Sequence, residues 1–231
     1  MKKSTVFTWL AILVLMPATI LLGRLLPGRS YYLTGTLLVV YMLIPFFLAF
    51  EDGKPAAREL VLIAVLCALA VASRAVFFWL PNFKPIYAII ILSGIVFGPQ
   101  AGFLVGAVSA FASNFLFGQG PWTPWQMLSY GICGYIAGVC YYKKESISQE
   151  PMLLGLFGFA VVLFGVCPIL DTSTVVTSLT VFTPASILAV YLSGLPMNLI
   201  QAASTLLFLL LLSKPLLNKL QRIVTKYGID S

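Results

Sequence analysis

Residues 85–97 (PIYAIIILSGIVF) and 101–117 (AGFLVGAVSAFASNFLF) contain no charged side chain and are separated only by Gly98-Pro99-Gln100. Such runs are typical of helices that cross a membrane, which need about 20 mostly apolar residues. The rest of the chain agrees, because 60% of its 231 residues are hydrophobic and only 9% are charged. A soluble domain carries about 25% charged residues. The sequence therefore predicts a protein embedded in a membrane.

The hydrophobic pattern predicts an all-α, polytopic protein with eight spans. These spans cover residues 6–23, 31–50, 59–80, 85–97, 101–117, 125–142, 152–170 and 184–213. The fourth and fifth are either two short spans or one broken helix, and the Gly-Pro pair favours a turn between them. Pro196 should kink the last span.

Polar composition divides the chain into four parts. Residues 1–50 form an N-terminal transmembrane hairpin, and residues 51–58 (EDGKPAAR) form a polar cytoplasmic linker. A six-span core follows at residues 59–213. The tail, residues 214–231, mixes basic and apolar residues and is predicted to be an amphipathic extension of the last span at the cytoplasmic surface. A docking surface for a cytoplasmic partner is the alternative.

The distribution of basic residues predicts that both termini are cytoplasmic. Short cytoplasmic loops carry an excess of Lys and Arg. With eight alternating spans, ten basic residues fall inside and three fall outside, and Arg74 is left within a span. The inside set is Lys2, Lys3, Lys54, Arg58, Lys143, Lys144, Lys214, Lys219, Arg222 and Lys226, and the outside set is Arg24, Arg29 and Lys84.

Several functional classes lack the residues that they need. The chain has no histidine, which is the commonest general base and metal ligand. Its four cysteines lie in apolar runs without CxxC spacing and are expected to be small buried hydrophobes. No phosphate-binding glycine loop, chain of intramembrane acids or nucleophile–base pair is visible, and the basic residues form no stripe for nucleic acid. We therefore predict no enzyme activity, no metal and no cofactor.

The segment Gly118–Gln126 (GQGPWTPWQ) joins two spans with two tryptophans and two prolines and no charge. Charge counting places this loop on the outer face. Interfacial tryptophans often only anchor a protein at the headgroups. The amide and hydroxyl side chains beside Trp122 and Trp125 instead favour a ligand site, because aromatic walls with a few placed polar groups are typical of small-molecule pockets. The polar candidates are Gln119, Thr123 and Gln126.

Four further side chains are expected near this loop. Arg74 lies within the third span, where a charge is expensive and indicates function, although it could also reach the headgroups or pair with carbonyls. Asn114 either bonds a neighbouring helix or lines a cavity below the loop. Asn82 and Lys84 lie in a second outer loop, and residues 171–183 form a third. The three outer loops could meet above the bundle as a pocket.

Small residues recur every four positions in three spans. Ala64, Ala68 and Ala72 share one helix face, and such stripes let another helix approach closely. Gly102, Gly106 and Ala110 form a second stripe, and Gly134 with Gly138 a third. Three stripes imply tight packing, so most should be internal. The alanine stripe is either internal too or a flat surface for a separate membrane protein.

Residues 59–213 resemble the substrate-binding S component of energy-coupling factor (ECF) vitamin transporters. The resemblance rests on the alanine stripe, the Asn-Phe-Lys-Pro segment, Phe97–Gly102 (FGPQAG) and the segment from Asn114 to Gln126. It implies a multi-pass protein of the bacterial plasma membrane that captures a vitamin or related micronutrient from outside. It also implies docking, through Ala64, Ala68 and Ala72, on a transmembrane coupling protein that works with two cytoplasmic ATPases.

The resemblance also assigns the substrate contacts. Arg74, Asn114, Trp122 and Trp125 are the strongest candidates, with Asn82, Lys84, Gln119 and Gln126 beside them. The cobalamin-related group looks closest, although a purine or pyrimidine ring would also suit the tryptophans. The N-terminal hairpin departs from a six-span S component, and its two helices must either move with the core or stay clear of the docking face. The alternatives are a secondary transporter of a nucleobase or vitamin precursor and a non-transport membrane assembly factor.

Overall fold

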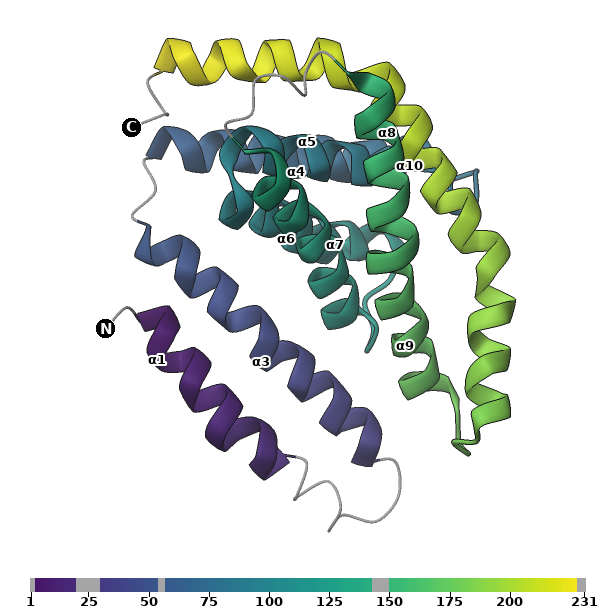
Figure 1. The fold of residues 1–231 in the computed structure, drawn as a ribbon. Helices are drawn as coiled ribbons and strands as arrows, with labels where there is room; N and C mark the ends of the chain where they lie inside the picture. The colour runs from purple at the N-terminus through teal and green to yellow at the C-terminus, as the bar shows by residue number, and fades with distance from the viewer. Residues whose placement is uncertain (1–2, 20–29, 54–56, 143–149, 228–231) are drawn as a thin grey trace.

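A computed structural model describes residues 3–19, 30–53, 57–142 and 150–227, and these ranges are helical with no strand (Figure 1). The elements are α1 (Lys3–Leu10), η1 (Ala11–Leu15), α3 (Ser30–Asp52), α4 (Ala57–Val76), α5 (Ile86–Phe97), α6 (Pro99–Phe117), α7 (Thr123–Tyr141), α8 (Pro151–Val161), η3 (Val162–Val166), α9 (Cys167–Ser178) and α10 (Pro184–Tyr227). Six basic residues used to predict orientation lie outside the described residues, namely Lys2, Arg24, Arg29, Lys54, Lys143 and Lys144.

The all-α, polytopic prediction is confirmed. Among the described residues, five helices are long and apolar enough to cross a membrane, and Ile86–Phe97 is a shorter apolar helix. The five are Leu33–Asp52, Ala57–Val76, Pro99–Phe117, Pro151–Ser178 and Pro184–Lys226. The two apolar runs around Gly98 form separate helices, as the Gly-Pro pair predicts. Gly98 has a φ of 89° and closes α5 on the carbonyl of Gly94, and Pro99 then begins α6.

Helices α5, α6 and α7 form the centre of the bundle through close backbone contact. A Cβ atom added to Gly106 would lie 2.2 Å from the carbonyl oxygen of Tyr130, and one added to Gly134 would lie 2.2 Å from that of Gly102. No real Cβ atom fits at such a distance, so glycine is required at both positions. Both glycine-containing stripes therefore pack inside the chain, as predicted.

The N-terminal hairpin packs against the core through aromatic side chains. Helices α1 and α3 run side by side, and α3 contacts α6, α7 and α9 (Figure 1). Phe46 of α3 stacks on the buried Phe103 of α6 with ring centroids 4.0 Å apart. The ends of the two hairpin helices are joined by the Ser4 hydroxyl, which donates to Asp52 Oδ2 over 2.7 Å. The hairpin is thus part of the packed structure.

The expectation that residues 171–183 form a loop is wrong over its first half. Helix α9 continues to Ser178, so Asp171 lies within a helix that belongs to a membrane-spanning segment. The hydroxyl groups of Thr172 and Thr177 donate to carbonyl oxygens four residues earlier, each over 2.7 Å. These bonds satisfy the polar side chains within the helix, so a Thr- and Ser-rich sequence continues the span.

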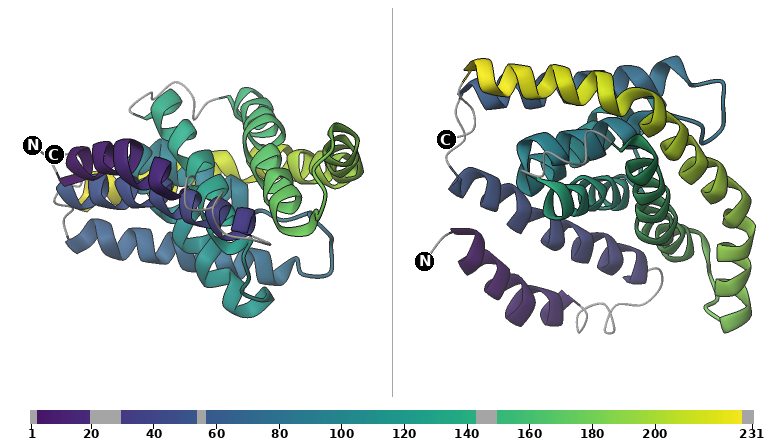
Figure 2. Two further views of the ribbon diagram at one scale, coloured as in Figure 1. Left: turned by 90° about the horizontal axis from the view of Figure 1, so that it is seen from below. Right: turned by 45° about the horizontal axis from the view of Figure 1, so that its top comes forward.

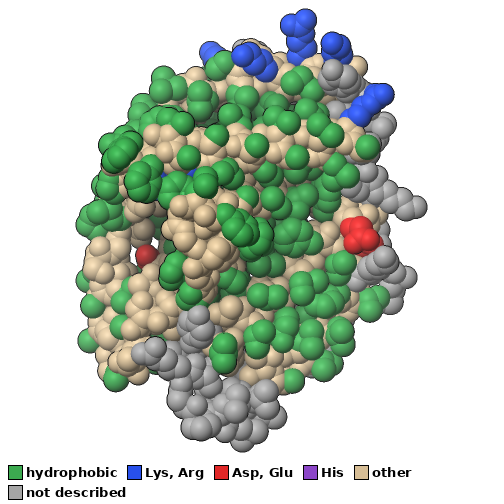
Figure 3. Space-filling model, turned by 180° about the vertical axis from the view of Figure 1, so that it is seen from behind, with side chains coloured by type: hydrophobic (Ala, Val, Ile, Leu, Met, Phe, Trp, Pro, Cys, Tyr) green, Lys and Arg blue, Asp and Glu red, His purple; other side chains and the backbone are tan. Residues whose placement is uncertain are grey.

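The last helix, α10, runs without interruption from the final span into the basic tail and curves around the molecule (Figure 2). Pro196 and Pro215 both lie inside it. In the tail, Leu217 and Leu220 are buried, whereas Lys214 and its basic neighbours are exposed. Basic side chains gather along this edge of the molecule (Figure 3). The tail is therefore an amphipathic continuation of the last span.

Candidate functional site

The first candidate site is a set of hydrogen-bonded polar side chains at the end of α4, which we call the Asn114 cluster. It comprises Arg74, Ser113, Asn114, Gln119, Thr123 and Gln126. Arg74 Nη1 donates to Ser113 Oγ and, over 3.0 Å, to Asn114 Oδ1. Asn114 is only 1% exposed. The structure therefore brings together two predicted site residues from different helices, and the guanidinium bonds to protein rather than reaching free into the headgroups.

The amide of Asn114 ties the tryptophan-containing loop to α6. Asn114 Nδ2 donates to Thr123 Oγ1 over 3.1 Å and to Gln126 Oε1 over 2.7 Å. The Thr123 hydroxyl donates in turn to Gln119 Oε1 over 3.0 Å and accepts from the Gly120 N–H over 3.2 Å. Four of the predicted contacts thus belong to one network. The side chains of this network use most of their hydrogen-bonding capacity on other groups of the chain.

Two cations share one aromatic ring beside this cluster. The Arg74 guanidinium lies 4.6 Å from the centroid of the Phe117 ring, and Lys84 Nζ lies 5.5 Å from it. The pKa of Lys84 is lowered from its ordinary value of 10.5, first because the side chain is partly buried and second because Arg74 is near. Within the described ranges, neither cation is paired with a carboxylate. This region therefore has positive potential.

The turn between α4 and α5 holds the remaining predicted contacts. Asn82 adopts a left-handed backbone conformation with a φ of 53° and is half-buried. Asparagine tolerates this conformation better than most residues. The carbonyl of Lys84 accepts a hydrogen bond from Ser204 Oγ of α10 over 3.1 Å. This turn is thus fixed to α10, and its Lys84 side chain reaches toward the ring that Arg74 also covers.

The two tryptophans of the loop have different surroundings. Trp122 is 43% exposed and lies over Gly120, where a Cβ atom would meet its ring at 2.4 Å. Trp125 is 9% exposed and packs in an apolar cluster that includes Val39 and Leu43 of α3. Its Nε1 atom has no hydrogen-bond partner among the described residues. Trp122 is therefore the tryptophan that remains accessible to a ligand.

A second set of polar side chains lies between α9 and α10. We call it the α9–α10 seam, and it comprises Asp171, Thr172, Tyr191, Gly194 and Asn198. Its α9 members were expected in the third outer loop, and those of α10 were not singled out from the sequence. Asn198 Nδ2 donates to Asp171 Oδ2 over 2.8 Å, and the hydroxyl groups of Thr172 and Tyr191 are 2.8 Å apart. The molecule is hollowed between these helices, with an acidic side chain visible inside the opening (Figure 3).

The seam has a signal in the sequence of α10. Tyr191, Gly194, Asn198 and Gln201 recur at intervals of three and four residues, which places them on one helix face. Gln201 is buried and its Nε2 atom donates to the hydroxyl of Tyr87 over 2.7 Å. A polar stripe on an apolar span indicates a face turned toward protein or a cavity rather than lipid. The described residues contain no group of three His, Cys, Asp or Glu side chains that could hold a metal ion.

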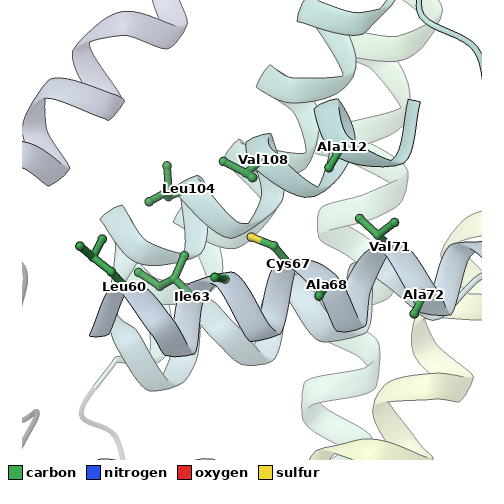
Figure 4. A pocket seen from close by; sticks show the side chains of 10 residues that line it. Leu60, Ile63, Cys67, Ala68, Val71, Ala72, Leu104, Val108 and Ala112 are labelled. Atoms are coloured by element: carbon green, nitrogen blue, oxygen red, sulfur yellow. The ribbon is translucent and has the colours of Figure 1, made fainter. Parts of the chain in front are cut away.

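The alanine stripe lies on the molecular surface. Ala64, Ala68 and Ala72 are all exposed and line a groove of about 570 Å³ between α4 and α6 (Figure 4). The other lining residues are apolar as well, and they include Leu104, Val108 and Ala112 of α6. The described part of the hairpin leaves the stripe uncovered, because all three alanines are exposed and the main contacts of α3 with the core are with α6, α7 and α9. The groove is thus an open apolar surface with small residues along one wall.

Together, these features define an integral, multi-pass membrane protein with polar side chains enclosed among its helices and an open groove on its side. Comparison with known families assigns it further. Residues 54–218 match the S component of the ECF-type riboflavin transporter. The chain belongs to this family of ECF transporter S components, which is a transporter family and not an enzyme family.

Individual relatives carry the family name UPF0397. The chain is 32% identical over 148 residues to a UPF0397 protein of Vibrio atlanticus (strain LGP32), which covers 58% of this chain and 81% of the relative. It is 34% identical over 88 residues to one of Aliivibrio fischeri (strain MJ11), spanning 48% of that protein. A third, from Lactococcus lactis subsp. cremoris (strain SK11), is 34% identical over 116 residues, spanning 57% of its length. No solved structure matches the chain.

Proposed function

We propose that this chain binds a vitamin or related micronutrient at the outer side of the bacterial plasma membrane and delivers it to an ECF-type ABC importer. One observation carries this proposal, namely that polar side chains gather at the ends of α4, α6 and α7 and between α9 and α10, within an otherwise apolar bundle. Alternation of the spans from a cytoplasmic N-terminus places these helix ends outside. Polar groups enclosed in a membrane protein are costly and commonly mark a substrate path.

The substrate is proposed at the level of a vitamin. The matched family is described for riboflavin, and nothing in the match favours the cobalamin-related group to which the sequence resemblance points. Both ligands belong in a binding panel. The exposed ring of Trp122 beside the Asn114 cluster suits a ligand with a planar ring, because such a ring can stack on an aromatic side chain at little entropic cost.

The proposed partners are a transmembrane coupling protein and two cytoplasmic ATPases. The open groove along Ala64, Ala68 and Ala72 supports this part of the proposal, because helices associate in lipid through small residues that allow close backbone approach. The hairpin packs on the other helices and leaves the stripe exposed. An additional hairpin is thus compatible with docking at this groove.

Uptake and binding should be measured separately. Purified protein is titrated with a vitamin panel that includes riboflavin and cobalamin, and Ala68→Phe is then compared with Ala203→Phe, a change at an exposed alanine of α10 outside the groove. We expect Ala68→Phe to abolish uptake and co-purification of the coupling protein while binding is retained. Ala203→Phe should behave as wild type. Normal uptake by Ala68→Phe without any ATPase partner would instead favour a secondary transporter.

A further inference from the structure

The α9–α10 seam contains a carboxylate with unused hydrogen-bonding capacity. Asp171 lies seven residues before the end of α9 at Ser178, which places it roughly 10 Å along the helix from that end. An ionised carboxylate has about four acceptor positions. Only one hydrogen bond reaches this one from the described residues, and its donor is the neutral amide of Asn198. Asp171 is half-buried, and no described residue uses its remaining acceptor positions.

No cation among the described residues neutralises Asp171. Of the basic residues in the described ranges, Arg74 bonds to Ser113 and Asn114, and neither it nor any other is paired with Asp171. A carboxylate within a membrane span is costly unless it is paired, and such residues commonly mark a substrate or ion path. Since no described residue supplies a positive charge to Asp171, a bound cation is the counter-charge that would favour its ionised form in the seam.

Glycine at position 194 lets the carboxylate of Asp171 lie close against α10. A Cβ atom at Gly194 would lie 2.8 Å from Asp171 Oδ1 and would require the carboxylate to move. Gly194 lies between Tyr191 and Asn198 on the same face of α10, so all three line the carboxylate's side of the seam. Aromatic faces attract organic cations, and Tyr191, whose hydroxyl lies 2.8 Å from that of Thr172, supplies such a ring in the seam.

We propose that the α9–α10 seam selects a substrate with a positively charged nitrogen, with Asp171 as its counter-ion. This rests on the proposed function and names the chemical class of its substrate. An organic cation fits better than a metal ion, because no cluster of three potential metal ligands occurs among the described residues. A neutral amide at position 171 would keep an acceptor for Asn198 and lose only the charge.

The test uses pairs of related compounds, one cationic and one neutral. Purified full-length protein in nanodiscs is titrated with pyridoxamine and pyridoxine, which carry an ammonium and a hydroxyl group at the same position. It is also titrated with thiamine, a permanent cation, and thiochrome, its neutral ring-closed form. Riboflavin serves as a neutral member outside these pairs. Titrations in sodium-free and sodium-containing buffers separate organic cations from a metal ion.

We expect at least one cation to bind at least about tenfold more tightly than its neutral partner, with no dependence on sodium. Asp171→Asn should abolish that preference, and Thr174→Ala, an exposed change on the same helix, should preserve it. Thermal unfolding of each variant shows that it is folded. Gly194→Ala should weaken cation binding as well, because it displaces Oδ1.

Other outcomes would overturn the proposal. If riboflavin binds and Asp171→Asn leaves its affinity unchanged, while no cation is preferred, the vitamin-binding function stands and the charge selection is refuted. A preference that survives Asp171→Asn also refutes it. Binding that follows sodium concentration assigns the carboxylate to a metal ion and not to the substrate. If no vitamin of the panel binds, both the charge selection and the proposed function fail.

Discussion

Replacing Asn114 with alanine tests whether the Asn114 cluster holds the tryptophan-containing loop to the bundle. The side chain is 1% exposed and makes three hydrogen bonds to side chains. Its Oδ1 atom accepts from Arg74, and its Nδ2 atom donates to Thr123 and Gln126. The substitution removes all three and leaves a small cavity between α4, α6 and α7.

The expected loss follows from these contacts. A hydrogen bond to a charged group contributes about 1.5–3 kcal/mol, and a neutral one contributes about 0.5–1.5 kcal/mol. Arg74 keeps Ser113, and Thr123 keeps Gln119 and the Gly120 amide. Because Arg74 and Thr123 keep these partners, losing Asn114 costs less free energy than leaving either side chain without a hydrogen bond. We therefore expect the free energy of unfolding to fall by about 3 kcal/mol.

Unfolding by a denaturing detergent in mixed micelles, followed by tryptophan fluorescence, measures this loss. Gln119→Ala is the graded control, because Gln119 is exposed and its removal should cost no more than about 1 kcal/mol. If Asn114→Ala unfolds within about 0.5 kcal/mol of wild type, the cluster does not stabilise the loop. Loss of vitamin binding in such a stable variant would instead make Asn114 a direct ligand contact.

Four further predictions follow from single positions. Gly106→Ala should prevent folding or lower the free energy of unfolding by about 3 kcal/mol or more, because the added Cβ atom would overlap a backbone carbonyl. Gly165→Ala is the control, because no atom lies within 4 Å of its added Cβ. Size-exclusion chromatography should show that this control folds normally. Trp125→Ala should destabilise the protein by about 3 kcal/mol in the same unfolding assay, because the ring packs on α3. Trp122→Ala should leave stability nearly unchanged and weaken vitamin binding by about 1 kcal/mol, and unchanged affinity would make this ring an anchor at the headgroups. Because the pKa of Lys84 is lowered in the folded protein, the unfolded chain binds this proton more tightly, so stability should increase as pH rises through the folded pKa toward 10.5. Lys84→Gln should flatten this increase, and an undiminished increase would assign it to another group.

Much of the fold was predictable, because long apolar runs leave a membrane-embedded chain few alternatives to the helix. The Gly-Pro turn at residues 98–99 and the internal packing of the glycine stripes are confirmed. The loop predicted at residues 171–183 is wrong up to Ser178, since threonine is associated with loops by composition but can satisfy its hydroxyl on the preceding helical turn.

The candidate site was predictable only in part. Arg74 and Asn114 are the expected polar residues of their spans, and both fall near the same side of the membrane, so their contact could be inferred from depth alone. The partner of Asp171 could not be inferred from the sequence. Asn198 lies 27 positions later, and only the relative rotation of α9 and α10 brings the two side chains together. Helical periodicity identifies a polar face on α10, but it does not say which helix that face meets.

Hydrogen-bonding capacity separates the two polar clusters more clearly than their composition does. Asn114 uses both amide hydrogens and one acceptor position on protein partners, so a ligand would have to displace Arg74, Thr123 or Gln126 to use most of its capacity. Among the described residues, Asp171 has one hydrogen-bond partner and keeps several free acceptor positions. A membrane protein gains stability from polar groups that are fully paired, and it can bind a polar ligand only through groups that are not. The Asn114 cluster is therefore better suited to fixing the loop in place, and the α9–α10 seam is better suited to holding the substrate.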